Sequence, residues 1–111
     1  MNIQMLKSKI HMARITDRSK EYDGSITIDR QLAVLAGLRE FEKVLVADVD
    51  TGNRFETYVI YGGKGEICVN GAAAELVRVG DRVIIMSFGI VEPEEVITPL
   101  VVRVDEKNRP V

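Results

Sequence analysis

The pair Gly24-Ser25 places a serine hydroxyl beside the carbonyl of a residue that lacks a Cβ. Glycine adopts backbone conformations closed to other residues, so the Ser25 oxygen can approach the Gly24 carbonyl carbon. Attack there would move the acyl group from nitrogen to oxygen and form an ester. Elimination would leave dehydroalanine at position 25, which hydrolyses to a pyruvoyl group. An isolated Gly-Ser pair is more often an ordinary turn, so this chemistry needs support from other residues.

A second group of candidates lies on the strand expected over 54–61. The planar guanidinium of Arg54 can bind both oxygens of a carboxylate, and the phenol of Tyr58 keeps its proton at neutral pH and can donate it. Alternation along a strand puts these two side chains on one face. Thr57 falls on the opposite face unless a bulge or a strong twist intervenes. The simpler alternatives are a solvated arginine and a half-buried strand tyrosine.

Other familiar constellations are weak in this sequence. His11 is the single histidine and Cys68 the single cysteine, which makes a poor metal site and leaves no internal disulfide. Cys68 sits in an apolar run, which favours a buried structural thiol over a reactive one. The Gly-Gly-Lys-Gly run at 62–65 lacks the Lys-Ser/Thr pair that opens a helix in a phosphate loop, so it indicates a flexible turn.

The composition fits one domain over residues 1–111, with 46% apolar residues and a net charge of −2. No basic run points to nucleic acid, and no apolar stretch reaches the length of a membrane span. The N-terminal residues do not resemble a signal peptide. We therefore expect a cytoplasmic protein with neither nucleic acid nor membrane as a partner.

Many short strands and two small helices predict a mainly β fold closed into a barrel, which removes exposed sheet edges. The first strand would carry Lys9, His11 and Ala13 on one face, and a polar loop would follow at 17–21. Asp29 is expected to cap a short helix that stops at Gly37. A further helical turn is expected at 72–74. The strands are expected over 10–16, 25–28, 43–48, 54–61, 67–69, 83–88 and near 96–104.

Four motifs occur in order: Lys-Ile-His at 9–11, Tyr-Asp-Gly-Ser at 22–25, Gly-Asn-Arg-Phe-Glu-Thr-Tyr at 52–58 and Val-Asn-Gly-Ala-Ala-Ala at 69–74. Together they resemble the aspartate 1-decarboxylase family, pyruvoyl-dependent enzymes that make β-alanine for pantothenate synthesis. The resemblance runs from Met1 to about Val104. Position 23 carries Asp where some members have Glu, which changes neither the cleaved bond nor the nucleophile.

The resemblance implies that the precursor cuts itself between Gly24 and Ser25, giving a β-chain of residues 1–24 and an α-chain of residues 25–111. The α-chain would begin with a pyruvoyl group made from Ser25. That group would form a Schiff base with L-aspartate and take the electron-sink role that pyridoxal phosphate plays elsewhere. Loss of CO₂, protonation and hydrolysis would release β-alanine, with no metal and no pyridoxal phosphate.

The resemblance also assigns roles to individual residues. Tyr58 would donate the proton, Arg54 would clamp a substrate carboxylate, and Lys9 could hold the second one. Thr57 would act in self-processing and touch the substrate. The other matching residues are the substrate-binding Gly71, Ala72 and Ala73 and the pocket or processing residues His11, Tyr22 and Asn70.

The family fold implied is a small six-stranded double-psi β-barrel with short helices. The family forms homotetramers with active sites between neighbouring subunits, and some members need an accessory processing factor. Two alternatives stay open on the residues alone. One is a non-catalytic double-psi barrel that binds a partner or small ligand and uses Gly24-Ser25 as a turn. The other is a pyruvoyl enzyme that acts on another amino acid.

Overall fold

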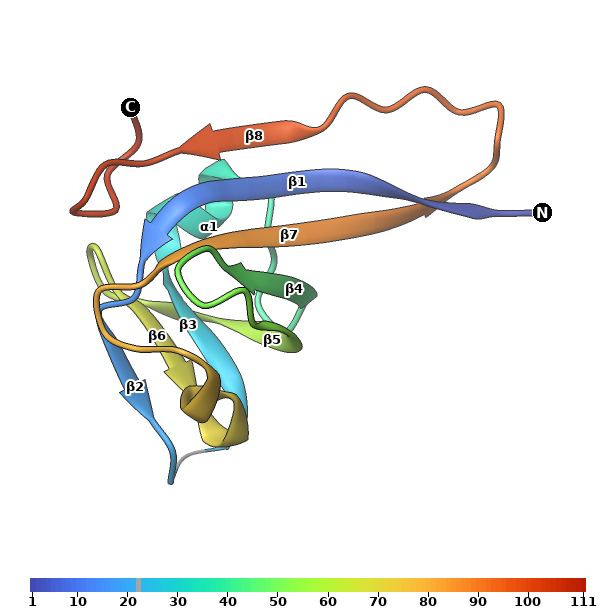
Figure 1. Cartoon of the computed structure of the whole chain (residues 1–111). Coiled ribbons are helices and arrows are strands. Elements are labelled where there is room, and N and C mark those ends of the chain that lie inside the picture. The colour runs from blue at the N-terminus through green and yellow to red at the C-terminus, as the bar shows by residue number, and fades with distance from the viewer. Residues whose placement is uncertain (22) are drawn as a thin grey trace.

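The computed structural model describes residues 1–21 and 23–111, which fold mainly into β-strands (Figure 1). Two short helical segments accompany the strands, the α-helix α1 (Arg30–Leu35) and the 3-10 helix η1 (Gly71–Leu76). The predicted mainly β fold with short helices is confirmed. The strands of the described residues are β1 (Ile3–Arg14), β2 (Asp17–Ser19), β3 (Ser25–Asp29), β4 (Lys43–Asp48), β5 (Arg54–Gly62), β6 (Ile67–Asn70), β7 (Arg82–Val91) and β8 (Leu100–Arg103).

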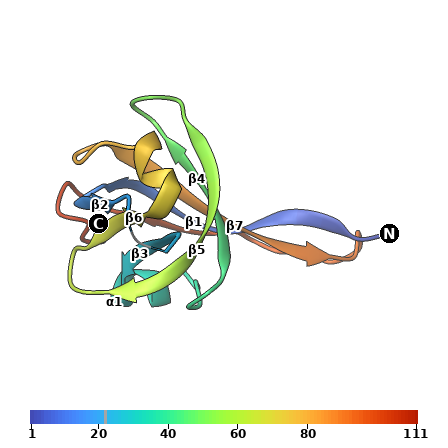
Figure 2. The same ribbon diagram turned by 90° about the horizontal axis from the view of Figure 1, so that it is seen from below.

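The strands form one mixed sheet in the order β2-β6-β3-β5-β4-β7-β1-β8. β1 and β2 lie near opposite ends of this order, yet Ile15 and Thr16 alone separate them in the chain. The Ile15 amide donates to the Asp81 carbonyl at 2.9 Å, and the Thr16 amide donates to the Ile67 carbonyl at 2.8 Å. The passage from β1 to β2 therefore joins the two ends and curls the sheet into a small barrel (Figure 2). The six strands from β6 to β1 are its wall, and the short β2 and β8 flank them.

Aliphatic side chains fill the interior of this barrel. Ile26 on β3 and Val59 on β5 are in register and fully buried, and so are Val46 on β4 and Ile85 on β7. Successive residues of a strand point to opposite faces, so the neighbours of these core residues face outward. This alternation decides which polar side chains share the outer face.

Helix α1 begins where the sequence predicts. The Asp29 side chain accepts from the Leu32 amide at 3.2 Å, which confirms it as the N-cap. The other Asp29 oxygen accepts from the Gly65 amide at 2.7 Å and ties the 62–65 segment to the end of β3. Gly37 follows the helix with φ +71°, as a glycine stop requires.

β1 is longer than predicted, because it begins at Ile3 rather than at Ile10. Its first half pairs with the last part of β7, from Ile3↔Val91 to Leu6↔Phe88, as a ribbon that projects from the barrel (Figure 1). The hydrophobic pattern did not reveal this ribbon, because backbone pairing holds it outside the core. β2 likewise lies inside the predicted polar loop and is held by parallel pairing with β6.

One face assignment was wrong. Lys9 and His11 are half-buried, but Ala13 is fully buried in the core cluster together with Ile10. A register shift between Ile10 and Ala13, with Met12 at φ 66°, turns the strand by one residue. Lys9 and His11 therefore do not share a face with Ala13.

Within residues 1–21 and 23–111, we find no helix with the length and apolar character that a membrane crossing needs.

Candidate active site

Ser25 is the first residue of β3, and its side chain has a dedicated donor. Ser25 is 6% exposed and pairs with Asn70 across the antiparallel β3–β6 ladder. Cross-strand partners project on the same face of a sheet. The Asn70 Nδ2 group donates to Ser25 Oγ at 2.9 Å and to Thr27 Oγ1 at 3.1 Å. The hydroxyl that would attack the Gly24 carbonyl is thus held by an amide from another strand.

Gly24 itself is exposed, and a Cβ added there would meet no atom of the described residues within 4 Å. Its φ lies outside the left-handed region, so the observed conformation does not require glycine. If glycine is needed at this position, it is needed when Ser25 Oγ approaches the Gly24 carbonyl carbon, and not for the conformation observed.

Strand register brings Tyr58 next to Ser25. β3 and β5 are parallel with Ile26 opposite Val59, and the preceding residues are Ser25 and Tyr58. Because Ile26 and Val59 both face the core, alternation turns Ser25 and Tyr58 to the outer face. Tyr58 is 37% exposed, and its ring centroid lies 6.5 Å from that of Phe41. A phenol and the candidate nucleophile therefore share one face of neighbouring strands.

Arg54 begins β5 on this same outer face and is exposed. The β4–β5 register runs without a shift from Lys43↔Tyr58 to Ala47↔Arg54. Arg54 and Tyr58 are four positions apart, an even number, so their side chains project on the same side of the strand, as predicted.

Thr57 points the other way. It pairs with the buried Val44, so its side chain is directed to the core side of β5. No bulge interrupts β5 between Arg54 and Tyr58. Within a single copy of the chain, Thr57 therefore does not share the face of these two residues.

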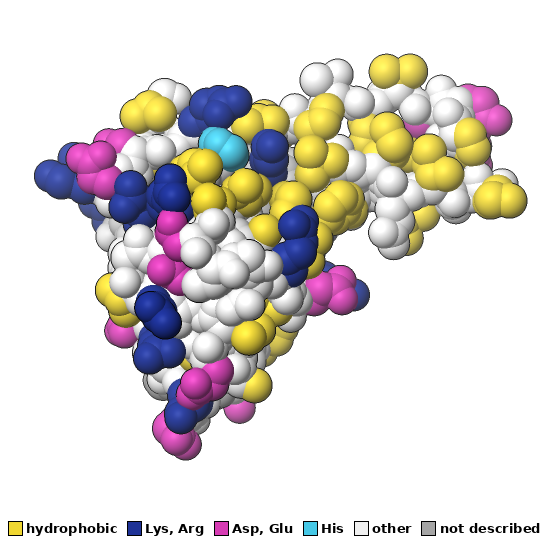
Figure 3. Space-filling view, in the orientation of Figure 1, with side chains coloured by type: hydrophobic (Ala, Val, Ile, Leu, Met, Phe, Trp, Pro, Cys, Tyr) yellow, Lys and Arg dark blue, Asp and Glu magenta, His cyan; other side chains and the backbone are white. Residues whose placement is uncertain are grey.

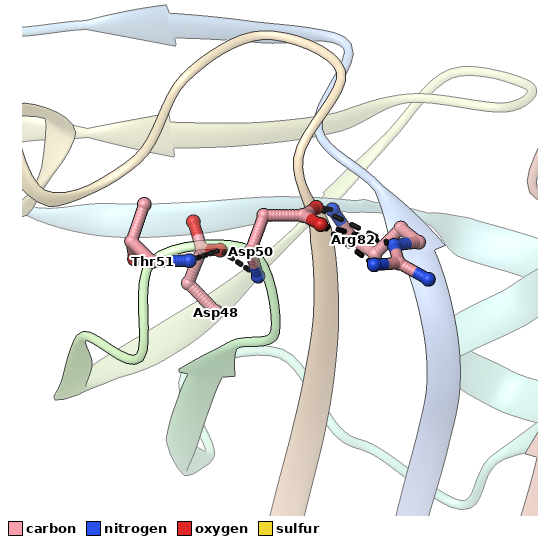
Figure 4. Close-up of polar contacts among 4 residues, drawn as sticks. All are labelled: Asp48, Asp50, Thr51 and Arg82. Atoms are coloured by element: carbon pink, nitrogen blue, oxygen red, sulfur yellow. Dashed lines mark hydrogen bonds and ion pairs between the residues drawn. The ribbon is translucent and has the colours of Figure 1, made fainter.

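The turn before Arg54 is held by an acidic cluster (Figure 4). Asp48 Oδ1 accepts from the amides of Asp50 and Thr51 at 2.8 and 3.0 Å. The Asp50 carboxylate forms an ion pair with Arg82 at 2.7 Å and joins the turn to the start of β7. These contacts fix where β5 starts and therefore where the Arg54 side chain leaves the sheet.

Among the described residues, three carboxylates of this cluster lie close enough together to resemble a cation-binding site. One oxygen each from Asp48, Asp50 and Asp81 lies within 4.8 Å of the others. Asp48 is 2% exposed and its Oδ2 has no hydrogen-bond partner among the described residues. Burial, with the Asp81 carboxyl beside it, raises the pKa of Asp48. Arg82 already neutralises Asp50, so the cluster is a structural clamp of the turn.

The predicted backbone segment follows Asn70 directly. Gly71 opens η1 with φ +80°, a conformation that favours glycine, and it is buried. Ala72 is exposed and Ala73 half-buried, so the segment borders the Ser25–Asn70 pair with small side chains.

Lys9 and His11 lie on a different part of the barrel. Both belong to β1, which pairs with β7 and β8, whereas Ser25 is on β3 between β5 and β6. Burial, together with the charges of Arg103 and Lys9, lowers the pKa of His11, which favours the neutral ring. None of the hydrogen bonds or strand pairings among the described residues connects Lys9 or His11 to Ser25. Tyr22 lies outside the described residues.

The sequence interpretation missed two residues beside the candidate nucleophile. Thr27 is the second acceptor of the Asn70 amide, and the Cys68 thiol donates to Asn70 Oδ1 at 3.3 Å. Each lies two positions from a recognised site residue, so alternation was a usable signal. The missing information was that β3 and β6 are neighbours.

A shallow groove of about 330 Å³ lies on the outer face under the ribbon. Lys43, Leu45, Glu56 and Phe88 are among its lining residues, but Ser25, Arg54 and Tyr58 are not. The three candidate residues therefore do not line this groove.

The known proteins that this chain resembles are enzymes named as decarboxylases. The profile of the aspartate decarboxylase family matches residues 1–111. The aspartate 1-decarboxylase of Acetivibrio thermocellus is 56% identical over 113 aligned residues, covering 98% of this chain and 90% of the relative. That of Helicobacter pylori is 56% identical over 111, covering 97% and 96%. That of Kosmotoga olearia is 53% identical over 109, covering 96% and 95%.

The chain belongs to the aspartate decarboxylase family, which confirms the resemblance seen in its motifs. It is an enzyme of the aspartate 1-decarboxylase type, a carboxy-lyase. The alternative of a non-catalytic binding module is therefore not favoured.

Proposed function

We propose that the chain cleaves itself between Gly24 and Ser25 and then converts L-aspartate to β-alanine and CO₂ with a pyruvoyl group derived from Ser25. The family match supports decarboxylation of aspartate. The observation that carries the cleavage step is the 2.9 Å hydrogen bond from Asn70 to the otherwise buried Ser25 hydroxyl. An isolated turn serine would not need a buried amide donor from another strand.

In the cleavage step, Ser25 Oγ bonds to the Gly24 carbonyl carbon, its proton passes to the Ser25 nitrogen, and the Gly24–Ser25 peptide C–N bond breaks. The resulting ester then eliminates the Gly24 carboxylate and leaves dehydroalanine. Water converts this residue to the pyruvoyl group and releases ammonia. The products are chains of residues 1–24 and 25–111. The N–H of Asn70 stabilises negative charge that develops on Oγ during the attack.

The residues around position 25 fit such a group. Asn70 supplies an N–H donor beside position 25 and Tyr58 lies in the next strand, so these two residues would border the group. When present, the pyruvoyl group supplies the electron-withdrawing carbonyl that loss of CO₂ needs. The chain's own residues bind the substrate, orient it and return a proton.

Tyr58 is our candidate for the proton donor, because its phenol is partly exposed on the face of Ser25 and its O–H can donate a proton. Arg54, exposed on the same face, would bind one carboxylate of aspartate through its planar fork. The amides at Gly71, Ala72 and Ala73 would line the other side of the substrate.

Lys9 and His11 enter this proposal through a second copy of the chain, whereas Thr57 enters it on the family resemblance alone. Lys9 would hold the other carboxylate, and His11 and Thr57 would assist processing or line the pocket. Because Lys9 and His11 lie apart from Ser25 within one chain, we propose a homotetramer with active sites between subunits. The projecting ribbon supports association, because hydrophobic side chains gather along it (Figure 3). Phe88 and Ile90 are exposed there, and so are Leu100 and Val101 on β8.

We also propose, from the family resemblance, that the β-alanine feeds pantothenate synthesis in the cytoplasm. Processing assisted by an accessory factor belongs to the same proposal.

Intact-mass analysis after incubation of the purified chain tests the central claim. The expected result is two fragments that match residues 1–24 and 25–111, the larger with a blocked N-terminus. Ser25→Ala should stay whole and inactive. Aspartate should be turned over in preference to glutamate. A folded wild-type chain that remains whole, with and without a cell extract to supply a processing factor, would refute the cleavage.

A further inference from the structure

The side chain of Asn70 has three hydrogen-bonding neighbours on one face of β3 and β6. Its Nδ2 donates to Ser25 Oγ at 2.9 Å and to Thr27 Oγ1 at 3.1 Å, and its Oδ1 accepts from Cys68 Sγ at 3.3 Å. The strand register pairs Ser25 with Asn70 and Thr27 with Cys68. These four side chains therefore form two adjacent cross-strand pairs on one face.

The two hydroxyls do not by themselves select the orientation of the Asn70 amide. A hydroxyl can either donate or accept, so Ser25 and Thr27 could bind an amide nitrogen or an amide oxygen equally well. A 180° turn of the amide would place Oδ1 toward Ser25, and the Ser25 hydroxyl would then donate its proton to Asn70. The two orientations have opposite consequences for the nucleophile.

The third neighbour distinguishes the orientations. A thiol is a weak donor and a weak acceptor, and the contact of 3.3 Å seen here is the donating one, so Cys68 favours Oδ1 on its own side. Burial, with the charges of Asp17 and Glu66, raises the pKa of Cys68, so the thiol keeps the proton that it donates. Cys68 is buried and has no disulfide partner, and among the described residues the hydrogen bond to Asn70 is the polar contact that its thiol makes.

We propose that Cys68 is a positioning residue for self-cleavage, because it holds the Asn70 amide with Nδ2 directed at Ser25 Oγ. In this orientation Oγ accepts a hydrogen bond and its own proton is free to leave as the oxygen attacks. In the opposite orientation the Ser25 proton would be engaged with Asn70, and the developing charge would face an oxygen. This inference rests on the proposed cleavage at Ser25 and adds a residue that does not touch the reacting atoms.

Cleavage kinetics of two Cys68 variants test the role. Cys68→Ala removes the donor, so the two remaining hydroxyls favour neither orientation and about half of the molecules would hold Nδ2 at Ser25. We therefore expect the rate of fragment formation to fall about twofold. Cys68→Ser introduces a hydroxyl that can donate or accept, so it should not restore the selection and should cleave about as slowly as Cys68→Ala. The matched control is Val69→Ala, whose side chain faces the core. It should lower the melting temperature but leave the rate in folded molecules unchanged.

A second measurement judges the inference independently of cleavage. In a Ser25→Ala background, which cannot cleave, Thr27 and Cys68 still hold Asn70. We expect the Asn70 side-chain amide protons to exchange with solvent about fivefold faster in NMR spectra when Cys68→Ala is added, and Cys68→Ser should restore the slow exchange.

Equal cleavage rates for wild type and Cys68→Ala, or a Cys68→Ser variant as fast as wild type, would overturn the proposal. If the wild-type chain does not cleave at all, the proposed function fails. Amide exchange that is unchanged by Cys68→Ala would then overturn this inference separately.

Discussion

Replacing Asn70 removes the only donor that we see on the candidate nucleophile among the described residues. Asn70→Ala deletes the whole amide. Asn70→Asp keeps its size but exchanges both N–H donors for a carboxylate oxygen. The hydrogen bond that touches the reacting atom is the 2.9 Å contact to Ser25 Oγ. The contacts to Thr27 and Cys68 only hold the amide in place.

The size of the effect follows from the charge on Oγ. As the Ser25 proton leaves, the oxygen becomes negative, and a hydrogen bond to a charged group contributes about 1.5–3 kcal/mol. At about 1.4 kcal/mol per tenfold in rate, Asn70→Ala should slow cleavage roughly 10- to 150-fold. Asn70→Asp should be at least as slow, because its carboxylate repels the developing charge.

The variants also lose stability, and the assay must separate this loss from the rate. Three neutral hydrogen bonds at roughly 1 kcal/mol each predict a loss of about 2–3 kcal/mol in the free energy of unfolding. The rate constant is therefore taken from intact-mass measurements at a temperature where circular dichroism shows each variant folded. Thr27→Val is the matched control, since it removes the other acceptor of Nδ2 and should change the rate less than about threefold. A folded Asn70→Asp chain that cleaves at the wild-type rate would refute the reasoning.

Three further outcomes are expected. Arg54→Ala should lower kcat/KM for aspartate roughly 10- to 100-fold with cleavage intact, because one charged hydrogen bond of about 1.5–3 kcal/mol is lost. Steady-state kinetics measure this change. An unchanged kcat/KM would contradict the role of Arg54 in binding a substrate carboxylate. Burial beside Asp81 raises the pKa of Asp48, so the folded state holds the proton of Asp48 more tightly than the unfolded state does. The free energy of unfolding should therefore fall as pH rises from the ordinary aspartate pKa to the raised one. Urea unfolding at several pH values should show this slope, and Asp48→Asn should remove it. Burial alone would raise the pKa of Glu42, but hydrogen bonds, including one from Lys7, lower it overall. Stability from Glu42 should then be present above the ordinary glutamate pKa and be lost as pH falls through the lowered one, and the same titration of Glu42→Gln should lack that loss.

Local patterns predicted much of the fold. The β4 strand begins and ends at the predicted residues, Asp29 caps α1, and Gly37 ends it with a positive φ. These features depend on neighbours in the chain, which the sequence displays directly. The projecting half of β1 and the short β2 were missed, because each is held by pairing with a distant strand and not by its own hydrophobic pattern.

The candidate site also has features that the sequence predicted and features that it did not. Alternation along β5 was enough to put Arg54 and Tyr58 on one face and Thr57 on the other. The ordered motifs were enough to indicate the family, which the comparisons confirm. The proximity of Ser25 to Tyr58, and the placement of Asn70 between Thr27 and Cys68, could not be read from spacing.

By itself the sequence determined the family, the candidate nucleophile at position 25 and the faces of individual strands, because motif order and alternation are properties of the linear chain. Only the tertiary structure decided what surrounds Ser25. Its amide donor, Asn70, is 45 positions away. The two meet because β3 lies between β5 and β6, in registers set by long-range backbone hydrogen bonds and by the burial of Ile26 against Val59. A shift of one residue in either register would turn these side chains to opposite faces.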